Sequence, residues 1–299
     1  MSVLAVGTRT SALARWQTRS VIAQLQAAWP GLECEERFYT TAGDQSPDRP
    51  LTEIGGAGVF TTELENALRA GEIDLAVHSL KDLPIEPAPG LALGAVGERA
   101  DARDVLVSRD GWTLQTLPEG ARLGTCSLRR SAQALGDRPD LTILPLRGNV
   151  DTRIRKAQAG EYDAIILAAA GVLRLGREAA ISEYLSFDVM LPAPGQGALA
   201  MQCRADDARV LALLAPLDHA PTRHAVQAER EFLLGMGGGC SAPVAAYGRL
   251  SAEGELHLNG LVSDAAGGRV VRVAGSGAEG LGRRLADEAL ALGAAELLQ

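Results

Sequence analysis

Arginine recurs at three places where a predicted strand gives way to a predicted helix. These junctions cover residues 7–11, 124–130 and 146–153, and each also holds hydroxyl side chains. In α/β sheets such junctions lie at the carboxyl ends of strands, where helix N-terminal N–H groups and guanidiniums can hold an anion together. One such arginine is usually a surface charge, but three junctions predict a ligand with several negative groups. Neither a Walker A loop nor Gly-x-Gly-x-x-Gly after a strand is present, so both carboxylates and phosphates remain open.

A second group of reactive residues follows another predicted strand, in the segment Val-His-Ser-Leu-Lys-Asp-Leu-Pro over residues 77–84. Lys81 and Asp82 place a cation beside an acid at the carboxyl end of that strand. Asp82 is a candidate for protonating a leaving group or stabilising a cation, and Lys81 for holding an anionic substituent. The alternative is a plain turn in which Asp82 caps the backbone. We interpret His78 as a packed, structural histidine.

A third feature is a cysteine at the end of a glycine-rich segment. Residues 235–240 read Gly-Met-Gly-Gly-Gly-Cys, and glycines let a backbone approach a bulky partner closely. A free cysteine is more often structural and buried among aliphatic residues. The setting of Cys240 instead favours a thiol displayed for covalent attachment or nucleophilic catalysis.

The composition narrows the class of protein. The chain has 299 residues, of which 46% are hydrophobic and 22% charged, which is typical of a globular domain protein. A net charge of −8 disfavours nucleic-acid binding, and no apolar stretch is long enough to cross a membrane. Without a signal sequence at Met1 we expect a cytoplasmic protein. The four cysteines form no Cys-x-x-Cys pair, so we expect no metal site.

The elements that must position these residues alternate between strand and helix, which predicts parallel sheets flanked by helices. We expect strands over 4–7, 33–40, 74–79, 122–125, 142–146 and 164–170, and helices over 11–29, 61–70 (opened by a threonine cap), 128–135 and 150–159. Beyond about Leu217 the pattern changes to a helix, a glycine loop, strands over 244–250, 255–262 and 269–273, and a helix near 281–298.

These patterns predict an α/β protein with two lobes and a smaller C-terminal α+β domain. The first domain is expected over residues 1–97 with 198–215, the second over 98–197 and the third over 216–299. Residues 43–58, rich in glycine and proline, are expected to form a mobile loop.

Taken in order, the motifs along nearly the whole chain resemble those of the porphobilinogen deaminase (hydroxymethylbilane synthase) family. Besides the segments above, the resemblance rests on Arg99, Asp101 and Arg103-Asp104, on Ala169-Ala170-Gly171 with Arg174-Leu175-Gly176, on Pro194-Gly195-Gln196-Gly197 and on Gly238-Gly239-Cys240. Each motif is short, but their order together is specific. The resemblance implies two lobes like those of periplasmic binding proteins and a third domain bearing the cysteine.

The resemblance also implies an activity and a site. A dipyrromethane cofactor would be held in thioether linkage to Cys240, and four porphobilinogen molecules would be added to it, each with loss of ammonia, before hydrolysis releases hydroxymethylbilane. Asp82 would be the catalytic carboxylate. Cofactor contacts would come from Ser79, Lys81, Thr125, Ser127, Arg129, Arg130 and Arg147. Substrate contacts would come from Arg9, Ser11, Gln17, Arg153, Arg174 and Gln196, with Phe60 as a lid and no metal.

The residues and this chemistry agree for a physical reason. Each pyrrole carries an acetate and a propionate, and arginines stay protonated and bind carboxylates as a fork. Loss of ammonia leaves a positively charged pyrrole, which an ionised Asp82 would stabilise.

We expect a monomer whose partner is the small-molecule substrate porphobilinogen, with neither nucleic acid nor membrane. In the loop, Glu53, Ala57 and Thr62 stand where the family often places lysine, so less positive charge is expected there.

Two other classes of protein remain as alternatives. A bilobal anion-binding protein would capture a polycarboxylate without transforming it, but nothing in binding alone requires a displayed Cys240. A cysteine-nucleophile hydrolase would need a histidine partner, and the sequence identifies none.

Overall fold

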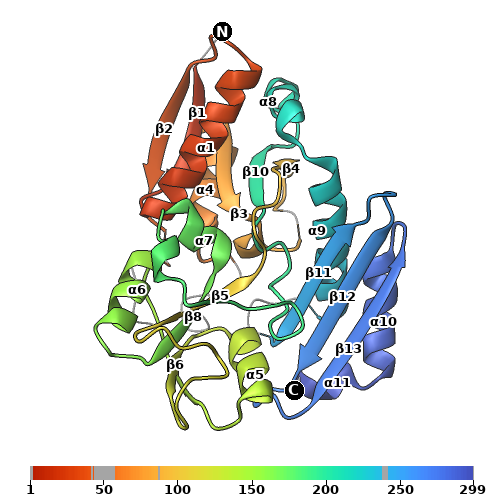
Figure 1. Cartoon of the computed structure of the whole chain (residues 1–299). Helices are drawn as coiled ribbons and strands as arrows, with labels where there is room; N and C mark the ends of the chain where they lie inside the picture. The colour runs from red at the N-terminus through yellow and green to blue at the C-terminus, as the bar shows by residue number, and fades with distance from the viewer. Residues whose placement is uncertain (1–2, 42, 44–57, 87, 238–241, 299) are drawn as a thin grey trace. The chain divides into compact units, whose positions relative to one another are not determined.

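The computed structural model describes residues 3–41, 43, 58–86, 88–237 and 242–298 (Figure 1). The chain divides into two compact units, unit 1 with residues 1–100 and 198–223, and unit 2 with residues 101–197 and 224–299. Unit 1 contains one five-stranded sheet, and unit 2 contains a second five-stranded sheet and a three-stranded one. These sheets confirm the predicted fold class of two α/β lobes with a smaller C-terminal α+β part. The division into three domains stays a prediction.

The first sheet has the strand order β2-β1-β3-β10-β4. Its strands are β1 (Leu4–Arg9), β2 (Cys34–Tyr39), β3 (Leu75–Ser79), β4 (Leu91–Val96) and β10 (Leu199–Arg204). The helices of unit 1 are α1 (Ala12–Ala28), α4 (Thr62–Arg69) and α8 (Ala208–Leu214), with 3₁₀ turns η1 (Leu80–Asp82) and η3 (Ala215–Leu217). Apolar side chains on alternate strand positions bury one face against α1 and α8 and the other against α4, as the period of two requires.

The second sheet also has five strands, in the order β7-β6-β8-β5-β9. Its strands are β5 (Asp104–Ser108), β6 (Arg122–Gly124), β7 (Thr142–Leu144), β8 (Ala164–Ala168) and β9 (Glu183–Tyr184). The accompanying helices are α5 (Leu128–Asp137), α6 (Val150–Gln158) and α7 (Ala169–Arg174), with the 3₁₀ turn η2 (Glu178–Ala180). Two buried clusters cover its faces, so both sides of this sheet belong to a core.

The expected parallel pairs are present in both five-stranded sheets, but each sheet also contains antiparallel pairs. In the first sheet β10 runs antiparallel to β3 and β4, and in the second β5 runs antiparallel to β8 and β9. The sequence pattern did not predict β4, β5, β9 and β10, because these strands lie outside the regular alternation of strand and α-helix. An antiparallel strand begins at the edge where its parallel neighbours end. The residues that start β5 and β10 therefore lie at the same edge as the carboxyl ends of β8 and β3, and we call this edge of each sheet its carboxyl edge.

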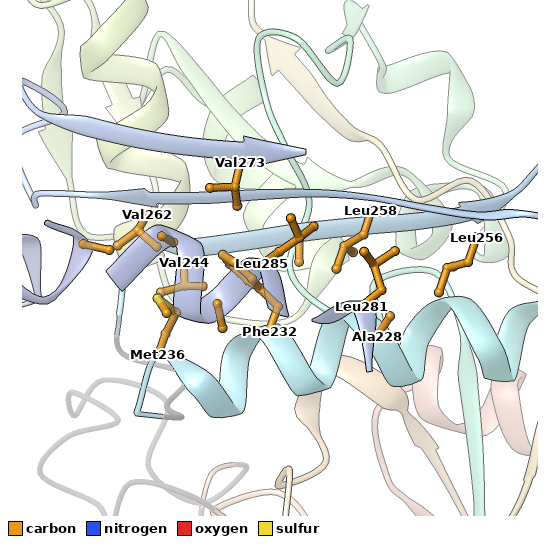
Figure 2. Close-up of a cluster of buried hydrophobic side chains, with 14 of the residues drawn as sticks. Ala228, Phe232, Met236, Val244, Leu256, Leu258, Val262, Val273, Leu281 and Leu285 are labelled. Atoms are coloured by element: carbon orange, nitrogen blue, oxygen red, sulfur yellow. The ribbon is translucent and has the colours of Figure 1, made fainter. Parts of the chain in front are cut away.

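The third sheet is an antiparallel meander of β11 (Val244–Leu250), β12 (Leu256–Ser263) and β13 (Val270–Gly277). Helices α9 (Ala220–Gly235), α10 (Leu281–Ala291) and α11 (Ala294–Leu297) accompany it. Figure 2 shows Phe232 of α9, and Met236 just after that helix, gathered with strand residues such as Leu258 and Val262 and with Leu285 of α10. The predicted final helix is divided because Gly293 has a φ of 93°.

Local details differ from the expected elements in two more places. The predicted strand over 164–170 ends at Ala168, and Ala169 begins α7, because the chain passes directly from strand to helix there. Thr61 precedes α4 as expected, but its side chain makes no capping hydrogen bond, and its hydroxyl contacts the carbonyl of Gly58 instead. Among the described residues no helix has the length and apolar character needed to cross a membrane.

Candidate functional site

Arg9 and Ser79 end two neighbouring parallel strands of the first sheet. Strands β1 and β3 pair through Val6–Leu75 and Gly7–Ala76, so their last residues lie together at the carboxyl edge. Gln17 of α1 is buried and donates a hydrogen bond from Nε2 to Ser79 Oγ at 2.9 Å. Ser11 is the N-cap of α1, and its Oγ accepts from Ala14 N at 3.3 Å. The structure thus brings Arg9, Ser11, Gln17 and Ser79 to one edge.

Lys81 and Asp82 follow at once on the turn η1, which closes with Leu83 N donating to the carbonyl of Leu80. The fully buried Leu80 anchors this turn, and its N–H donates to the carbonyl of Ala198, just before β10. In the part of unit 1 that the structure describes, the Asp82 carboxylate accepts no hydrogen bond and forms no ion pair. The interpretation of Asp82 as a backbone cap is therefore wrong, and its oxygens remain available to a ligand.

Phe60 lies against the guanidinium of Arg9. The Arg9 Cζ atom is 4.4 Å from the centre of the Phe60 ring, a cation–π contact. A side chain on Gly43 would overlap the same ring, so Gly43 allows the close approach. The stacked ring supports Arg9 from one side, while the role of Phe60 as a lid stays a prediction. Thr62, one of the three loop positions of interest, begins α4, whereas Glu53 and Ala57 lie outside the described residues.

Behind this edge is a buried polar pair that the sequence analysis did not connect. His78 on β3 and Gln202 on β10 lie two residues apart in register on adjacent antiparallel strands, since Ala200 pairs with His78. Both side chains are buried, and the interaction of Gln202 with the imidazole acts to raise the pKa of His78, against the effect of burial. Burial lowers the pKa of His78 to about 4, so the imidazole is neutral near pH 7. This agrees with a packed rather than catalytic histidine.

In the second sheet the two remaining arginine junctions follow adjacent parallel strands, β6 and β7. Ser127 caps α5, with its Oγ accepting from Arg130 N, and Asn149 caps α6, with its Oδ1 accepting from Thr152 N at 2.9 Å. Thr125 is buried, and its N–H donates to the carbonyl of Leu144. Both helix N-termini therefore face the carboxyl edge, where their dipoles favour an anion.

The arginines near this edge have different surroundings. Arg147 is half-buried and has no hydrogen-bond or ion-pair partner within the described chain. Arg153 donates from Nε to the carbonyl of Gly148 at 2.7 Å. Arg174 donates from Nη2 to the carbonyl of Gly197 at 2.8 Å, and burial lowers its pKa to about 10, which leaves it protonated at neutral pH. Arg147 is thus the best placed of the three to receive an external carboxylate.

Arg129 and Arg130 are instead buried around one carboxylate, that of Asp104. Arg129 Nη1 lies 2.7 Å from Asp104 Oδ2, and Arg130 Nη2 lies 2.7 Å from Oδ1. Gln196 Nε2 donates to the same Oδ1 at 3.0 Å. Burial works to raise the pKa of Asp104, but the two guanidiniums outweigh it and hold the pKa below its usual range. From the sequence, Asp104 is only the last residue of the motif Arg103-Asp104, and no role was predicted for it.

The predicted residues therefore fall into two groups, each at the carboxyl edge of its own sheet. Unit 1 holds Arg9, Ser11, Gln17, Phe60, Ser79, Lys81 and Asp82, and unit 2 holds Thr125, Ser127, Arg129, Arg130, Arg147, Arg153, Arg174 and Gln196. Cys240 and the glycines before it lie outside the described residues, as does most of the loop over residues 43–58. Among the described residues, no group of three or more His, Cys, Asp or Glu could hold a metal. Asp104 and Gln202 were missed because the antiparallel strands that carry them were missed.

Comparison with known protein families gives two matches along the chain. Residues 4–212 match the family described as porphobilinogen deaminase, dipyromethane cofactor binding domain, and residues 224–291 match the porphobilinogen deaminase C-terminal domain. The sequence is similar to the porphobilinogen deaminase of Roseiflexus sp. strain RS-1, with 53% identity over 99% of this chain and 98% of the relative. That of Brevibacillus brevis strain 47 is 48% identical over 98% and 96% of the two chains.

Solved structures with a related backbone include the VFT2 domain of Bordetella pertussis BvgS, with 18% identity and a TM-score of 0.43 over 71% of this chain and 84% of that one. The periplasmic aliphatic sulphonate binding protein SsuA of Escherichia coli matches with 14% identity and a TM-score of 0.41, covering 78% of this chain and 70% of that chain.

Proposed function

The chain belongs to the porphobilinogen deaminase family, and we propose which of its residues carry out the reaction of that family. Its activity is that of a hydroxymethylbilane synthase, a transferase of tetrapyrrole and haem biosynthesis that works with a dipyrromethane cofactor. Four porphobilinogen molecules are condensed with loss of ammonia, and hydrolysis releases the linear tetrapyrrole. Family membership decides against the two alternatives, a passive anion-binding protein and a cysteine hydrolase.

The described residues fit a cofactor whose side chains are carboxylates. Arg147 is a half-buried guanidinium without an acidic partner in the described chain, and it lies beside the capped N-termini of α5 and α6. Such a donor set selects an anion, and the fork of arginine matches a carboxylate. We propose that Ser79, Lys81, Thr125, Ser127, Arg129, Arg130 and Arg147 hold the cofactor and that Cys240 carries it as a thioether. When bound, the cofactor supplies the pyrrole carbon to which the first substrate is joined.

Asp82 is the proposed catalytic carboxylate. The observation that carries this assignment is its place beside Lys81 at the carboxyl edge of the first sheet, where no described group occupies its oxygens. An ionised carboxylate there stabilises the positive charge that develops when ammonia leaves porphobilinogen, because it is already oriented before the reaction. The same oxygens can accept a hydrogen bond from the pyrrole N–H, and a carboxyl that has first taken up a proton can pass it to the departing amine.

Substrate side chains are proposed to bind Arg9, Ser11, Gln17, Arg153, Arg174 and Gln196. Arg9 is supported by the ring of Phe60, which holds the guanidinium in place and makes Phe60 a candidate lid over the bound pyrrole. Gln17 and Ser79 already share a hydrogen bond, which fixes the hydroxyl at the strand end. We further propose a cytoplasmic monomer without nucleic-acid partners, with residues 1–97 and 198–215, 98–197, and 216–299 as its three domains.

Intact-mass measurement of the purified protein tests the covalent attachment. The wild type should carry a mass excess equal to two pyrrole units, and Cys240→Ser should lose it. Cys126→Ser is the matched control, because Cys126 is an exposed cysteine on the loop before α5 and should leave the mass excess intact. An unmodified mass on fully active wild-type protein would exclude the proposed attachment.

A further inference from the structure

Asp104 occupies an unusual place for a buried acid. It begins β5, which runs antiparallel to β8, and it pairs with Ala168 at the last position of β8. The start of β5 therefore lies at the carboxyl edge of the second sheet, directly behind the helix that begins with Leu128-Arg129-Arg130. The side chain is 0% exposed, so its hydrogen bonds are all to protein groups.

The two arginines around Asp104 differ in how many of their nitrogens donate hydrogen bonds to the protein. Arg130 employs all three of its nitrogens, since Nε and Nη2 bind Asp104 and Nη1 donates to the carbonyl of Ile166. Arg129 uses only Nη1, which binds Asp104 Oδ2 and the carbonyl of Leu191. Within the described chain, Arg129 Nε and Nη2 make no hydrogen bond, and neither is among the fully enclosed polar atoms without a partner. Those donors therefore retain accessible surface.

The charges in this cluster do not balance. One carboxylate faces two guanidiniums, which leaves a net positive charge, and Nε and Nη2 of Arg129 donate to no described group. Burying charges is costly unless they are paired and hydrogen-bonded, so a lone excess cation of this kind suits a ligand that brings the missing negative charge. Two glutamines also belong to this cluster. Gln196 donates to Asp104 Oδ1, while Gln133 donates to the carbonyl of Leu191 and accepts from its N–H.

We propose that Asp104 is a positioning residue that fixes the guanidinium of Arg129 so that its free donors receive a carboxylate of the cofactor. Arg130 stabilises the cluster from within the protein, because each of its three nitrogens already donates a hydrogen bond to a protein group. This inference rests on the proposed role of Arg129 in holding the cofactor. Asp104 itself touches neither cofactor nor substrate and is not a catalytic residue.

Two variants of Asp104 test positioning separately from charge. Asp104→Asn keeps the shape but removes the negative charge, and Asp104→Glu keeps the charge but moves the carboxylate by one methylene. Both should reduce the fraction of purified protein that carries the two-pyrrole mass excess, by about tenfold, as expected when a charged hydrogen bond is lost. In the fraction that is loaded, KM for porphobilinogen should change less than the loading does, because elongation also uses the other arginines.

Asp163→Asn is the matched control. Asp163 also binds an arginine of β6, Arg122, at 2.9 Å, but at the opposite edge of the same sheet. Thermal midpoints of all variants separate a general loss of stability from a loss of cofactor loading.

Normal loading of both Asp104 variants would overturn the inference, as would a loss of loading in Asp163→Asn at an equal thermal midpoint. If Asp104→Asn does not fold, Asp104→Glu alone decides by the same criterion. An unloaded but active wild type would instead refute the covalent attachment, so the two failures are distinguishable.

Discussion

At the scale of single residues, Asp82 of unit 1 and Asp104 of unit 2 show how the surroundings of an aspartate decide its role. Asp104 is enclosed by two guanidiniums that keep it ionised and occupied, whereas Asp82 accepts no hydrogen bond within the described chain. A carboxylate without internal partners contributes little to stability but remains available to a substrate. A carboxylate with several internal partners contributes more to stability and is not available to a substrate. Its removal leaves buried cations unpaired.

Replacing Asp82 by asparagine should therefore separate activity from stability. We expect kcat to fall by about 10²- to 10⁴-fold, because a positioned acid–base group contributes that much, while the thermal midpoint changes little. Steady-state kinetics and thermal unfolding measure the two effects. Asp206→Asn, an exposed acid of the same unit, is the control and should alter neither. Near wild-type turnover in Asp82→Asn would remove this carboxylate from the reaction.

His78 should make the stability of the protein depend on pH. The folded pKa of about 4 lies below the unfolded value of 6.5, so between these pH values only the unfolded chain binds the proton. The free energy of unfolding should then fall as the pH drops from 6.5 to 4, by about 3 kcal/mol in total, and should be unaffected by this group above pH 6.5.

Denaturant unfolding at several pH values measures this slope. In His78→Gln the pH dependence over this range should become shallower than in the wild type. The control is His257→Gln, which removes a partly exposed histidine of β12. An identical slope in the wild type and His78→Gln would show that His78 is not the group responsible.

At the scale of elements, each five-stranded sheet gathers its site residues by the same means. Parallel strands end at the carboxyl edge, helices begin there with Ser11, Ser127 or Asn149 as caps, and one antiparallel strand brings its first residue to the same place. The position of α5 matters most, because it carries Arg129 and Arg130. The hairpin between β12 and β13 packs against this helix, since a side chain at Gly267 would overlap the backbone of Ala132 and Gly136.

Gly267→Ala should therefore be more harmful than an ordinary glycine substitution. Gly267 has a φ of +74°, and its Cβ would also collide with α5, so we expect a loss of about 2–4 kcal/mol in unfolding free energy from backbone strain and overpacking together. Gly254→Ala is the matched control. Gly254 has a φ of +83° in the preceding hairpin but open space around it, so only the strain of about 1–2 kcal/mol applies. Equal losses would show that the hairpin does not press on α5.

At the scale of the whole molecule, the second five-stranded sheet and the C-terminal sheet belong to one compact unit, unit 2. Glu229 of α9, which is fully buried, contributes to this connection. Its Oε2 accepts from Gly195 N and its Oε1 from Gly248 N, both at 2.7 Å. One carboxylate thus joins the helix that leads to Cys240, the third sheet and the segment that carries Gln196.

Glu229→Gln should loosen this junction. An amide has only one acceptor oxygen, so one of the two backbone N–H groups would lose its partner and face an NH₂ group. Leaving a buried donor unsatisfied costs about 1–3 kcal/mol, which thermal or denaturant unfolding would detect. Glu288→Gln, on the exposed side of α10, is the control and should be neutral. Unchanged stability in Glu229→Gln would mean that the junction is held by other contacts.

The sequence by itself determined the local chemistry. The Ser-Leu-Lys-Asp segment, the arginine junctions, the glycine-rich cysteine segment and the ends of most helices and strands follow from neighbouring residues, and so they could be predicted from spacing, composition and family motifs. Short strands such as β5 and β10 could not, because their direction depends on partners far away in the chain.

Only the tertiary structure decided which charges are engaged. Arg129, Arg130 and Arg147 look alike as residues, yet two of them surround a buried carboxylate and the third has no described partner. That difference arises because an antiparallel strand brings Asp104 to the edge where the helix begins. Pairing between distant residues is a property of the folded chain, and the physical cost of burying a charge then determines which arginines remain available for a ligand.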